Sequence, residues 1–237
     1  MSHFVLVHGA WHGAWCWERL TPLLESQGHS VIARDLPGMG ADRTEPGLIT
    51  LDLWASTVAE LVRAAPEPVV MVAHSRGGIV ASQVAELLPR GIRRLVYLAA
   101  YLLPSGQTIA AEARTDSESL IAPNMIPAVR GVTCTLRAQV VHEAFHGMCS
   151  PEDATRAALR LTPEPLKPLV TPLSLGEHFA RVPRAYVECT RDRTISLTAQ
   201  RRMQAALPCD PVYTLDSDHS PFYSCPRPLA DLLGQVC

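Results

Sequence analysis

The sequence predicts an α/β fold with one mainly parallel six-stranded sheet, flanked by helices and interrupted by a helical insertion. Apolar, β-branched runs as long as strands alternate along the chain with amphipathic segments as long as helices. The alternation stops once, in a long proline-rich stretch, and then resumes. The chain has 237 residues, of which 47% are hydrophobic, and this length suits one domain of ordinary size.

The N-terminal part contributes four strands and three helices to this prediction. Its strand candidates are apolar runs, which are typical of strands buried on both faces of a parallel sheet. They are residues 4–7, 30–33, 69–73 and 95–100. The helix candidates between them carry apolar residues at helical spacing. They are residues 15–27, 51–64 and 79–88.

The C-terminal part repeats the alternation. We expect strands at residues 184–189 and 211–215, and helices at residues 197–207 and 228–236. These elements complete the six strands of the predicted sheet.

The stretch between the two parts has a different character. Nine prolines separate short helical pieces such as residues 151–161. A segment of this length without strand periodicity, placed between two core strands, indicates an inserted lid rather than a linker. The predicted division is a core at residues 1–103 and 184–237 and a lid at residues 104–183.

Composition and charge exclude several classes of partner. The 21 basic side chains are outnumbered by 23 acidic ones, so no cationic excess is present to bind a nucleic acid or an anionic membrane surface. No apolar run reaches the roughly 20 residues of a membrane helix, and the early run at residues 4–7 is too short for a signal peptide. We therefore expect a cytoplasmic protein.

The seven cysteines lack the paired spacing of metal or redox sites. We expect them to be reduced and mostly buried thiols, and we expect no metal ion or organic cofactor. The cysteines are Cys16, Cys134, Cys149, Cys189, Cys209, Cys225 and Cys237.

The segment at residues 69–80 carries the strongest functional signal. An apolar strand runs into the turn Ala73-His-Ser75-Arg-Gly77, and a helix candidate follows directly. Small residues two positions before and two after a serine let the strand and the helix approach closely. Ala73 departs from the usual glycine only by a methyl group. Ser75 is therefore the candidate nucleophile, and the helix N-terminus beside it would stabilise a developing negative charge.

A serine nucleophile of this kind needs an acid and a histidine base, in the chain order Ser, Asp or Glu, His. His219 lies in a polar loop directly after the last strand candidate, where the base is expected. Asp192 lies in the loop after the preceding strand and would hold the imidazole in the correct tautomer. Asp216 and Asp218 compete for this role, but as neighbours of the histidine they favour turn formation.

The other histidines are expected to have structural roles. His8 follows the first strand candidate, where a local hydrogen bond would shape the loop. Those expected in the lid, at the surface or at strand edges are His142, His146, His178, His3 and His29.

Two backbone N–H groups are expected to form an oxyanion hole. One follows the nucleophile, at Arg76, and the other comes from the loop after the first strand, where we choose Ala10. Glycines in that loop allow the backbone to approach a substrate closely. The Arg76 side chain either contacts an acidic group of the substrate or turns away and pairs with a surface carboxylate.

An apolar substrate pocket is expected between the lid and this loop. We expect Trp11 and Arg76 to contact the substrate from the core, and Phe145 and Phe179 to contact it from the lid. The alternative for Trp11 is packing in the core, together with the two other tryptophans of the loop.

Together these motifs resemble one branch of the α/β-hydrolase superfamily. They are the run from Phe4 to Trp17, Asp35-Leu-Pro-Gly38, the turn around Ser75, Cys-Thr-Arg-Asp192 and Asp-His219-Ser-Pro-Phe. The branch contains plant salicylate-binding methylesterases, alkaloid esterases and hydroxynitrile lyases, and bacterial esterases share it. The resemblance covers both parts of the predicted core. It implies a triad of Ser75, Asp192 and His219, with Ala10 and Arg76 as backbone donors.

The resemblance implies a serine carboxylic ester hydrolase that forms an acyl-enzyme with small to medium hydrophobic esters, methyl esters among them. Hydroxynitrile lyases of this branch have Thr at the position of Ala10 and Lys at the position of Ser220, so lyase activity is disfavoured. A lactonase and a small-molecule receptor with little turnover are further alternatives. The expected partner is a small-molecule ester, and a homodimer is compatible with this expectation.

Overall fold

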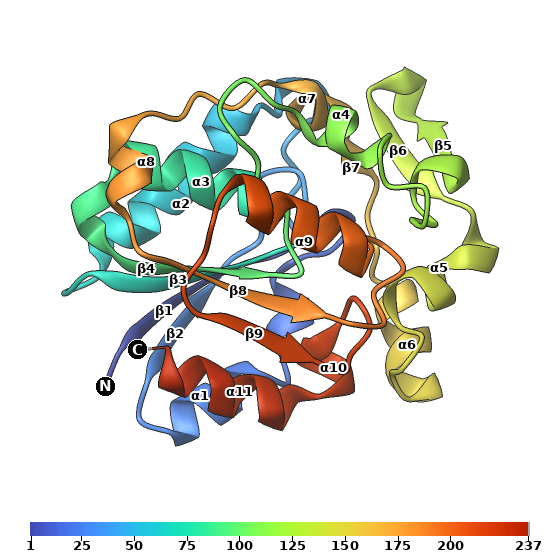
Figure 1. Ribbon diagram of the computed structural model, residues 1–237. Helices are drawn as coiled ribbons and strands as arrows, with labels where there is room; N and C mark the ends of the chain where they lie inside the picture. Colours follow the sequence, from blue (N-terminus) through green and yellow to red (C-terminus); the bar gives the residue numbers. More distant parts are fainter. Residues whose placement is uncertain (237) are drawn as a thin grey trace.

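A six-stranded parallel sheet lies at the centre of the computed structural model, which describes residues 1–236 (Figure 1). The strand order is β2-β1-β3-β4-β8-β9, and every neighbouring pair runs parallel. The strands are β1 (His3–Val7), β2 (Ser30–Ala33), β3 (Val69–His74), β4 (Ile92–Leu98), β8 (Arg184–Cys189) and β9 (Val212–Leu215). The predicted fold class is confirmed. Cys237, one of the seven expected thiols, lies outside the described residues.

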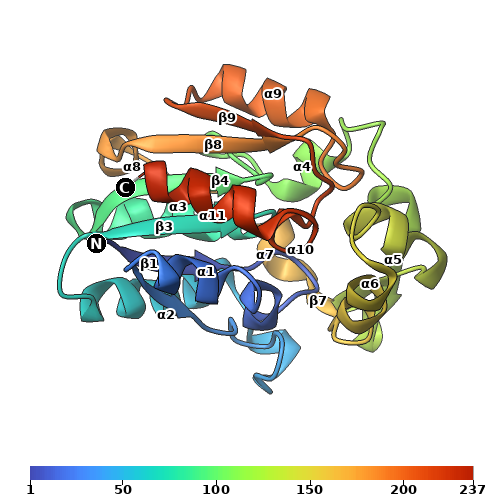
Figure 2. The ribbon, with the colours of Figure 1, turned by 90° about the horizontal axis from the view of Figure 1, so that it is seen from below.

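Helices cover both faces of this sheet (Figures 1 and 2). Successive residues of a strand point to opposite faces, so Val5 and Val7 enter one apolar core while Phe4 and Leu6 enter the other. The first core also contains residues of α2 (Leu51–Ala64), α3 (Gly77–Leu87) and α9 (Leu197–Ala206). The second contains residues of α1 (Thr21–Ser26), α10 (Pro221–Ser224) and α11 (Pro226–Gln235).

The helix expected at residues 15–27 is divided in the structure. A 3-10 helix covers Ala14–Trp17, and α1 begins only at Thr21. The physical reason is Pro22, which has no N–H for a helical hydrogen bond and therefore begins a helix instead of continuing one. By contrast, α2 has the predicted bounds, because Thr50 caps it by accepting a hydrogen bond from the N–H of Leu53 at 3.0 Å.

The residues between β4 and β8 form short helices, as predicted, but they also form strands that the sequence did not predict. They include a small antiparallel sheet in the order β5-β6-β7, whose strands have two to four residues. Strands this short leave no periodic signal in the sequence. The strands are β5 (Met125–Ala128), β6 (Thr133–Leu136) and β7 (Glu164–Pro165). The helices are α4 (Ile109–Ala113), α5 (Ala138–Phe145), α6 (Pro151–Ala158), α7 (Leu166–Val170) and α8 (Glu177–Arg181).

This segment occupies two separate places around the sheet (Figure 1). The elements β5, β6, α5 and α6 lie at the right of the view, beside the edge toward which the arrows of β8 and β9 point. Helix α8 lies at the opposite end and packs on α3. Among residues 1–236, no helix has the length and apolar composition needed to cross a bilayer.

Candidate active site

Ser75 occupies a strained turn between β3 and α3. Its φ is +54°, in the left-handed region that residues other than glycine rarely adopt. Glycines make the tight turn sterically feasible. A Cβ on Gly77 would lie 2.8 Å from the carbonyl oxygen of Val7, and one on Gly78 would clash with the carbonyl oxygen of Tyr101. The turn therefore holds Ser75 at the end of a central strand.

His219 and Asp192 form a buried hydrogen-bonded pair at the same edge of the sheet. His219 follows β9 and Asp192 follows β8, and Nδ1 of the ring lies 2.7 Å from Oδ2 of the carboxylate. The other carboxylate oxygen, Oδ1, accepts hydrogen bonds from the N–H groups of Thr194 at 2.7 Å and Ile195 at 2.9 Å. Because these bonds hold the carboxylate in place, it orients the ring and leaves Nε2 for a second partner.

The two competing acids have other partners. Asp216 lies at the surface in an ion pair of 2.8 Å. Asp218 is buried and accepts a hydrogen bond from the N–H of Met148 at 2.8 Å. Among the described residues, neither carboxylate is hydrogen-bonded to the His219 ring. Of the three candidates, the structure therefore brings Asp192 to the histidine.

A second histidine, His74, connects the two halves of the site, and nothing in the sequence indicated this role. It is the last residue of β3, directly before Ser75, and it is completely buried. Its Nε2 lies 2.8 Å from the carbonyl oxygen of His219, 145 positions later in the chain. The two ring centroids are 4.4 Å apart. This bond ties the loop of His219 to the strand that carries Ser75.

The loop after β1, which contains Ala10, passes beside the nucleophile. A Cβ added to Gly9 would lie 2.8 Å from Cβ of Ser75, so this loop passes directly beside it. In the part of the chain that the structure describes, the N–H groups of Ala10 and Arg76 have no hydrogen-bond acceptor. The N–H of Trp11, by contrast, donates to a carboxylate oxygen at 2.9 Å. The N–H of Ala10 is therefore free to donate to a ligand, whereas that of Trp11 is not.

An apolar cavity of about 180 Å³ adjoins Ser75. The core contributes Ala10, Trp11 and Tyr101 to its wall, and the segment between β4 and β8 contributes aliphatic side chains. These include Ile109, Ile121, Met125, Leu166 and Leu169. A second cavity, of about 250 Å³, also touches Trp11 but does not include Ser75. The wall next to the serine thus favours an apolar ligand group.

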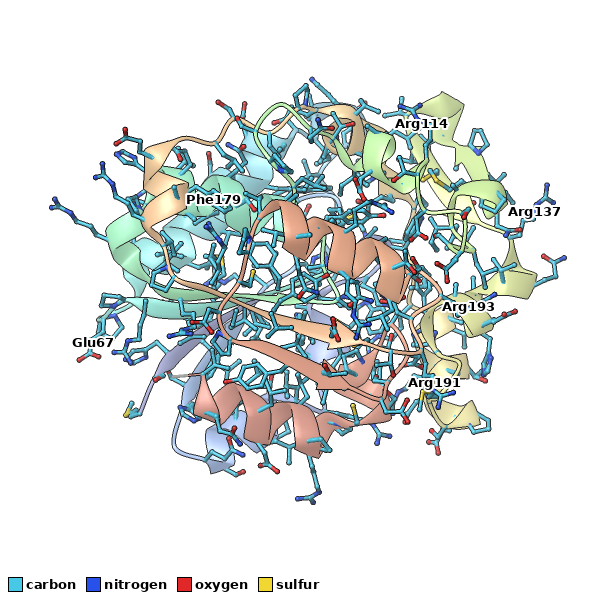
Figure 3. All side chains as sticks on the ribbon, viewed as in Figure 1. Glu67, Arg114, Arg137, Phe179, Arg191 and Arg193 are labelled. Carbon is cyan, nitrogen blue, oxygen red and sulfur yellow. The ribbon has the colours of Figure 1, made fainter. Side chains whose placement is uncertain are left out.

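The predicted substrate contacts have different fates. Trp11 lines the cavity. Phe145 is not one of the lining residues, and its ring centroid lies 5.7 Å from that of Trp11 and 5.9 Å from that of His219. Phe179 is wrong as a substrate contact. It is buried in the core, and Figure 3 shows it far from Arg191 and Arg193, the neighbours of Asp192. The physical reason is that α8, the last helix of the insertion, packs on α3 and not beside the other insertion elements.

The Arg76 side chain follows neither of the two expectations. It is completely buried and pairs with Glu164 of β7, with Nε 2.9 Å from Oε1. Its Nη2 donates to the carbonyl oxygen of Gly9 at 3.0 Å, and its guanidinium carbon lies 4.0 Å from the ring centroid of Trp54. Burial raises the pKa of Glu164, while the charge of Arg76 opposes that rise. The partner is thus a buried carboxylate rather than a substrate acid or a surface group.

Two histidines beside the site are buried in their neutral form. Burial lowers the pKa of His12 to about 4 and that of His146 to about 3. His146 lies in the inserted segment, as predicted, and it is completely buried. In the described chain, neither ring nitrogen of His146 has a hydrogen-bond partner. Protonation of the His146 ring would therefore create a buried charge without compensation, whereas the Ala10 oxygen would compensate part of a charge on His12.

These two histidines predict a loss of stability in mild acid. Below the ordinary pKa of 6.5 these histidines become protonated in the unfolded chain but stay neutral in the folded protein. The free energy of unfolding therefore falls as the pH falls toward 4. The slope that each histidine contributes approaches about 1.4 kcal/mol per pH unit once the pH is well below 6.5. Urea unfolding at several values between pH 6.5 and 5 measures this slope. His146→Phe should reduce it, and His142→Gln, at an exposed position of α5, should not. An unchanged slope in His146→Phe would contradict the prediction.

The chain is similar to known proteins over nearly its whole length. The chain matches the model described as Alpha/beta hydrolase family over residues 4–232. Salicylic acid-binding protein 2 of Nicotiana tabacum is 34% identical over 217 residues, which cover 84% of this chain and 83% of that protein. Methylesterase 1 of Arabidopsis thaliana is 31% identical over 258 residues, which cover 99% of this chain and 95% of that protein.

A solved structure shows the same similarity. A pyrethroid hydrolase from Sphingobium faniae JZ-2 has a TM-score of 0.87 at 27% identity, covering 99% of this chain and 96% of that one. The chain spans 64% of the length of a longer chloroplastic methylesterase of Arabidopsis thaliana, at 30% identity. The match at residues 4–232 includes both the parallel sheet and the segment inserted between β4 and β8.

Proposed function

Because this chain belongs to the α/β-hydrolase family as a carboxylesterase-type hydrolase, we propose that Ser75, His219 and Asp192 act as its catalytic triad. The substrates are small to medium hydrophobic esters, methyl esters among them. The observation that carries the proposal is the buried 2.7 Å bond between Asp192 and His219 at the sheet edge where the strained turn of Ser75 lies.

The first half-reaction would form an acyl-enzyme. Nε2 of His219 takes the proton of Ser75 while Oγ attacks the ester carbonyl carbon. The carbonyl π electrons move onto oxygen, and the N–H groups of Ala10 and Arg76 donate hydrogen bonds to this oxyanion. When the tetrahedral intermediate collapses, the imidazolium gives its proton to the departing alkoxide, which leaves as an alcohol. Asp192 stabilises the imidazolium throughout.

The second half-reaction would release the acid. Nε2 of His219 takes a proton from water, the water oxygen attacks the acyl carbon, and a second oxyanion forms in the same position. The bond to Oγ of Ser75 then breaks, and the proton returns from His219 to the serine. These steps need no group beyond the triad, the two N–H donors and water.

The aliphatic wall of the cavity supports apolar acyl groups as substrates. The names of two relatives support ester substrates: the one from Sphingobium faniae is a pyrethroid hydrolase, and the one from Arabidopsis thaliana is a methylesterase, which supports methyl esters among them. We infer that the acyl group lies in the cavity beside Ser75.

A chain-length series of p-nitrophenyl esters tests the proposed function. We expect kcat/KM to rise from acetate to acyl groups of roughly four to eight carbons, because these fill the cavity, and to fall for longer chains. A set of methyl esters assayed for acid release tests the alcohol side. Tight binding of salicylate without turnover of any ester would favour a receptor instead. Cleavage of mandelonitrile faster than of any ester would favour a lyase.

A further inference from the structure

The direction of the Ala10 N–H depends on the two peptide units that flank Ala10. A peptide unit is planar and trans, so its C=O and N–H point to opposite sides. The carbonyl of Gly9 shares a unit with the N–H of Ala10, and the carbonyl of Ala10 shares the next unit with the N–H of Trp11. Groups that hold the Gly9 oxygen and the Trp11 N–H therefore set where the Ala10 N–H points.

Arg76 and Glu164 hold both of these atoms. Nη2 of Arg76 donates to the Gly9 oxygen at 3.0 Å, and the Trp11 N–H donates to Oε2 of Glu164 at 2.9 Å. The two side chains are themselves joined at 2.9 Å between Nε and Oε1. One ion pair thus connects the turn of the nucleophile, the loop after β1 and strand β7.

Trp11 has a backbone conformation that needs such support. Its φ is +58°, in the left-handed region that a bulky side chain rarely adopts, so the surrounding contacts must maintain it. His12 and His8 also contact these two peptide units, His8 at the same oxygen as Arg76. Nδ1 of His12 lies 2.7 Å from the Ala10 oxygen, and Nδ1 of His8 lies 2.9 Å from the Gly9 oxygen.

Stability alone is a weak reason for this ion pair. Both side chains have no exposed surface, and taking two charges out of water costs free energy that their attraction only partly offsets. Apolar residues of similar volume often replace such a pair without loss of stability. What an apolar pair cannot do is donate to the Gly9 oxygen and accept from the Trp11 N–H.

We propose that Arg76 and Glu164 are positioning residues that aim the Ala10 N–H at the oxyanion of the tetrahedral intermediate. Arg76 then acts twice: its own N–H is one oxyanion donor, and its guanidinium orients the other. The inference rests on the proposed function, since it assigns a role within the same reaction. It also gives β7 a task in the site, because β7 supplies the carboxylate.

The test is a double variant, Arg76→Met with Glu164→Leu. It removes the hydrogen bonds to the Gly9 oxygen and from the Trp11 N–H without leaving a buried charge. We expect a folded protein whose kcat falls roughly 10- to 100-fold while KM changes less than about threefold, because the lost interaction acts on the transition state. Arg76→Lys is a second variant. It keeps the charge opposite Glu164 but loses the planar fork that reaches two acceptors, so kcat should fall in the same direction.

Affinity for a trifluoromethyl ketone separates positioning from a purely structural role. Oγ of Ser75 adds to the ketone carbon, the serine proton goes to His219, and the π electrons form an oxyanion that uses the same N–H donors. The affinity should fall in parallel with kcat in both variants. The matched control is Asp153→Asn. Asp153 is a buried carboxylate of the insertion, and it pairs with Arg19 of the core at 2.6 Å. The control should lower the melting temperature and leave kcat and inhibitor affinity unchanged.

The outcomes distinguish the inference from the proposed function. Suppose that the wild type hydrolyses esters and Ser75→Ala does not. A folded double variant with kcat and inhibitor affinity within twofold of wild type then overturns the inference and leaves the proposed function intact. The same conclusion follows if the Asp153→Asn control, at an equal loss of melting temperature, loses as much kcat as the double variant. If the wild type hydrolyses no ester, the proposed function fails and the inference fails with it.

Discussion

Ser75→Ala should hydrolyse p-nitrophenyl butyrate at least about 10⁴-fold more slowly than the wild type, with KM little changed. The variant lacks the oxygen that attacks the carbonyl carbon, and the remaining rate comes from the N–H donors and the cavity. The substitution removes one atom from a residue that is 4% exposed, so the fold and the cavity should persist. Initial rates combined with the melting temperature measure both effects.

A buried serine of the neighbouring helix provides the matched control. Ser82 of α3 is completely buried, and its hydroxyl donates to the carbonyl oxygen of Gly78 at 2.9 Å. Ser82→Ala should lower stability by about 1 to 2 kcal/mol, because the Tyr97 hydroxyl, 2.8 Å away, loses its partner. Its kcat should stay at the wild-type value. If Ser75→Ala retained more than about one hundredth of the activity, the acyl-enzyme mechanism would have to be abandoned.

Asp192→Asn should lower kcat by about 10⁴-fold, the second-largest effect that we expect. The amide oxygen of the new side chain would keep the bonds from the N–H groups of Thr194 and Ile195. Its NH₂ would then face Nδ1 of His219, where Oδ2 now lies at 2.7 Å. A donor at this position requires an unprotonated Nδ1 and places the proton on Nε2. That tautomer cannot take the proton of Ser75.

The neighbouring loop offers the control for this prediction. Asp216 is an exposed carboxylate three positions before His219 in the chain, and it pairs with Arg191 at the surface. Asp216→Asn should keep kcat within about twofold, because surface ion pairs contribute little. NMR of the His219 ring would follow the tautomer directly. If Asp192→Asn kept a tenth of the wild-type rate or more, Asp218 would become the candidate acid.

The elements that the sequence predicted well have local causes. The helix at residues 51–64 and the strand at residues 184–189 have the predicted bounds. The signals that set these bounds, the spacing of apolar residues and the cap of the helix, lie in the elements themselves or directly beside them. The turn at Ser75 is equally local, since the small residues and the apolar strand adjoin the serine. The chain order of Asp192 and His219 after it follows the order of the last two strands of the sheet.

The features that the sequence did not predict depend on residues far apart in the chain. The strands of the small sheet are too short for a periodic pattern and exist only through their pairing, as in Ile126 opposite Thr135. Phe179 is an aromatic residue of the kind that often lines an apolar pocket. Its helix, α8, packs on α3, so the Phe179 side chain is buried in the core. The hydrogen bond between His74 and the carbonyl oxygen of His219 could not be predicted, because the two residues are 145 positions apart in the chain.

The sequence by itself determined the fold class, the strained turn and the identity of the three triad candidates, because each depends on short-range patterns that physical chemistry constrains strongly. Only the tertiary structure decided which carboxylate faces His219, which side chains line the cavity and where the Arg76 guanidinium lies. Arg76 and Glu164 are 88 positions apart, and neither charge alone indicates burial. Their pairing follows from the way the inserted segment folds onto the sheet edge, and it sets the direction of a single backbone N–H.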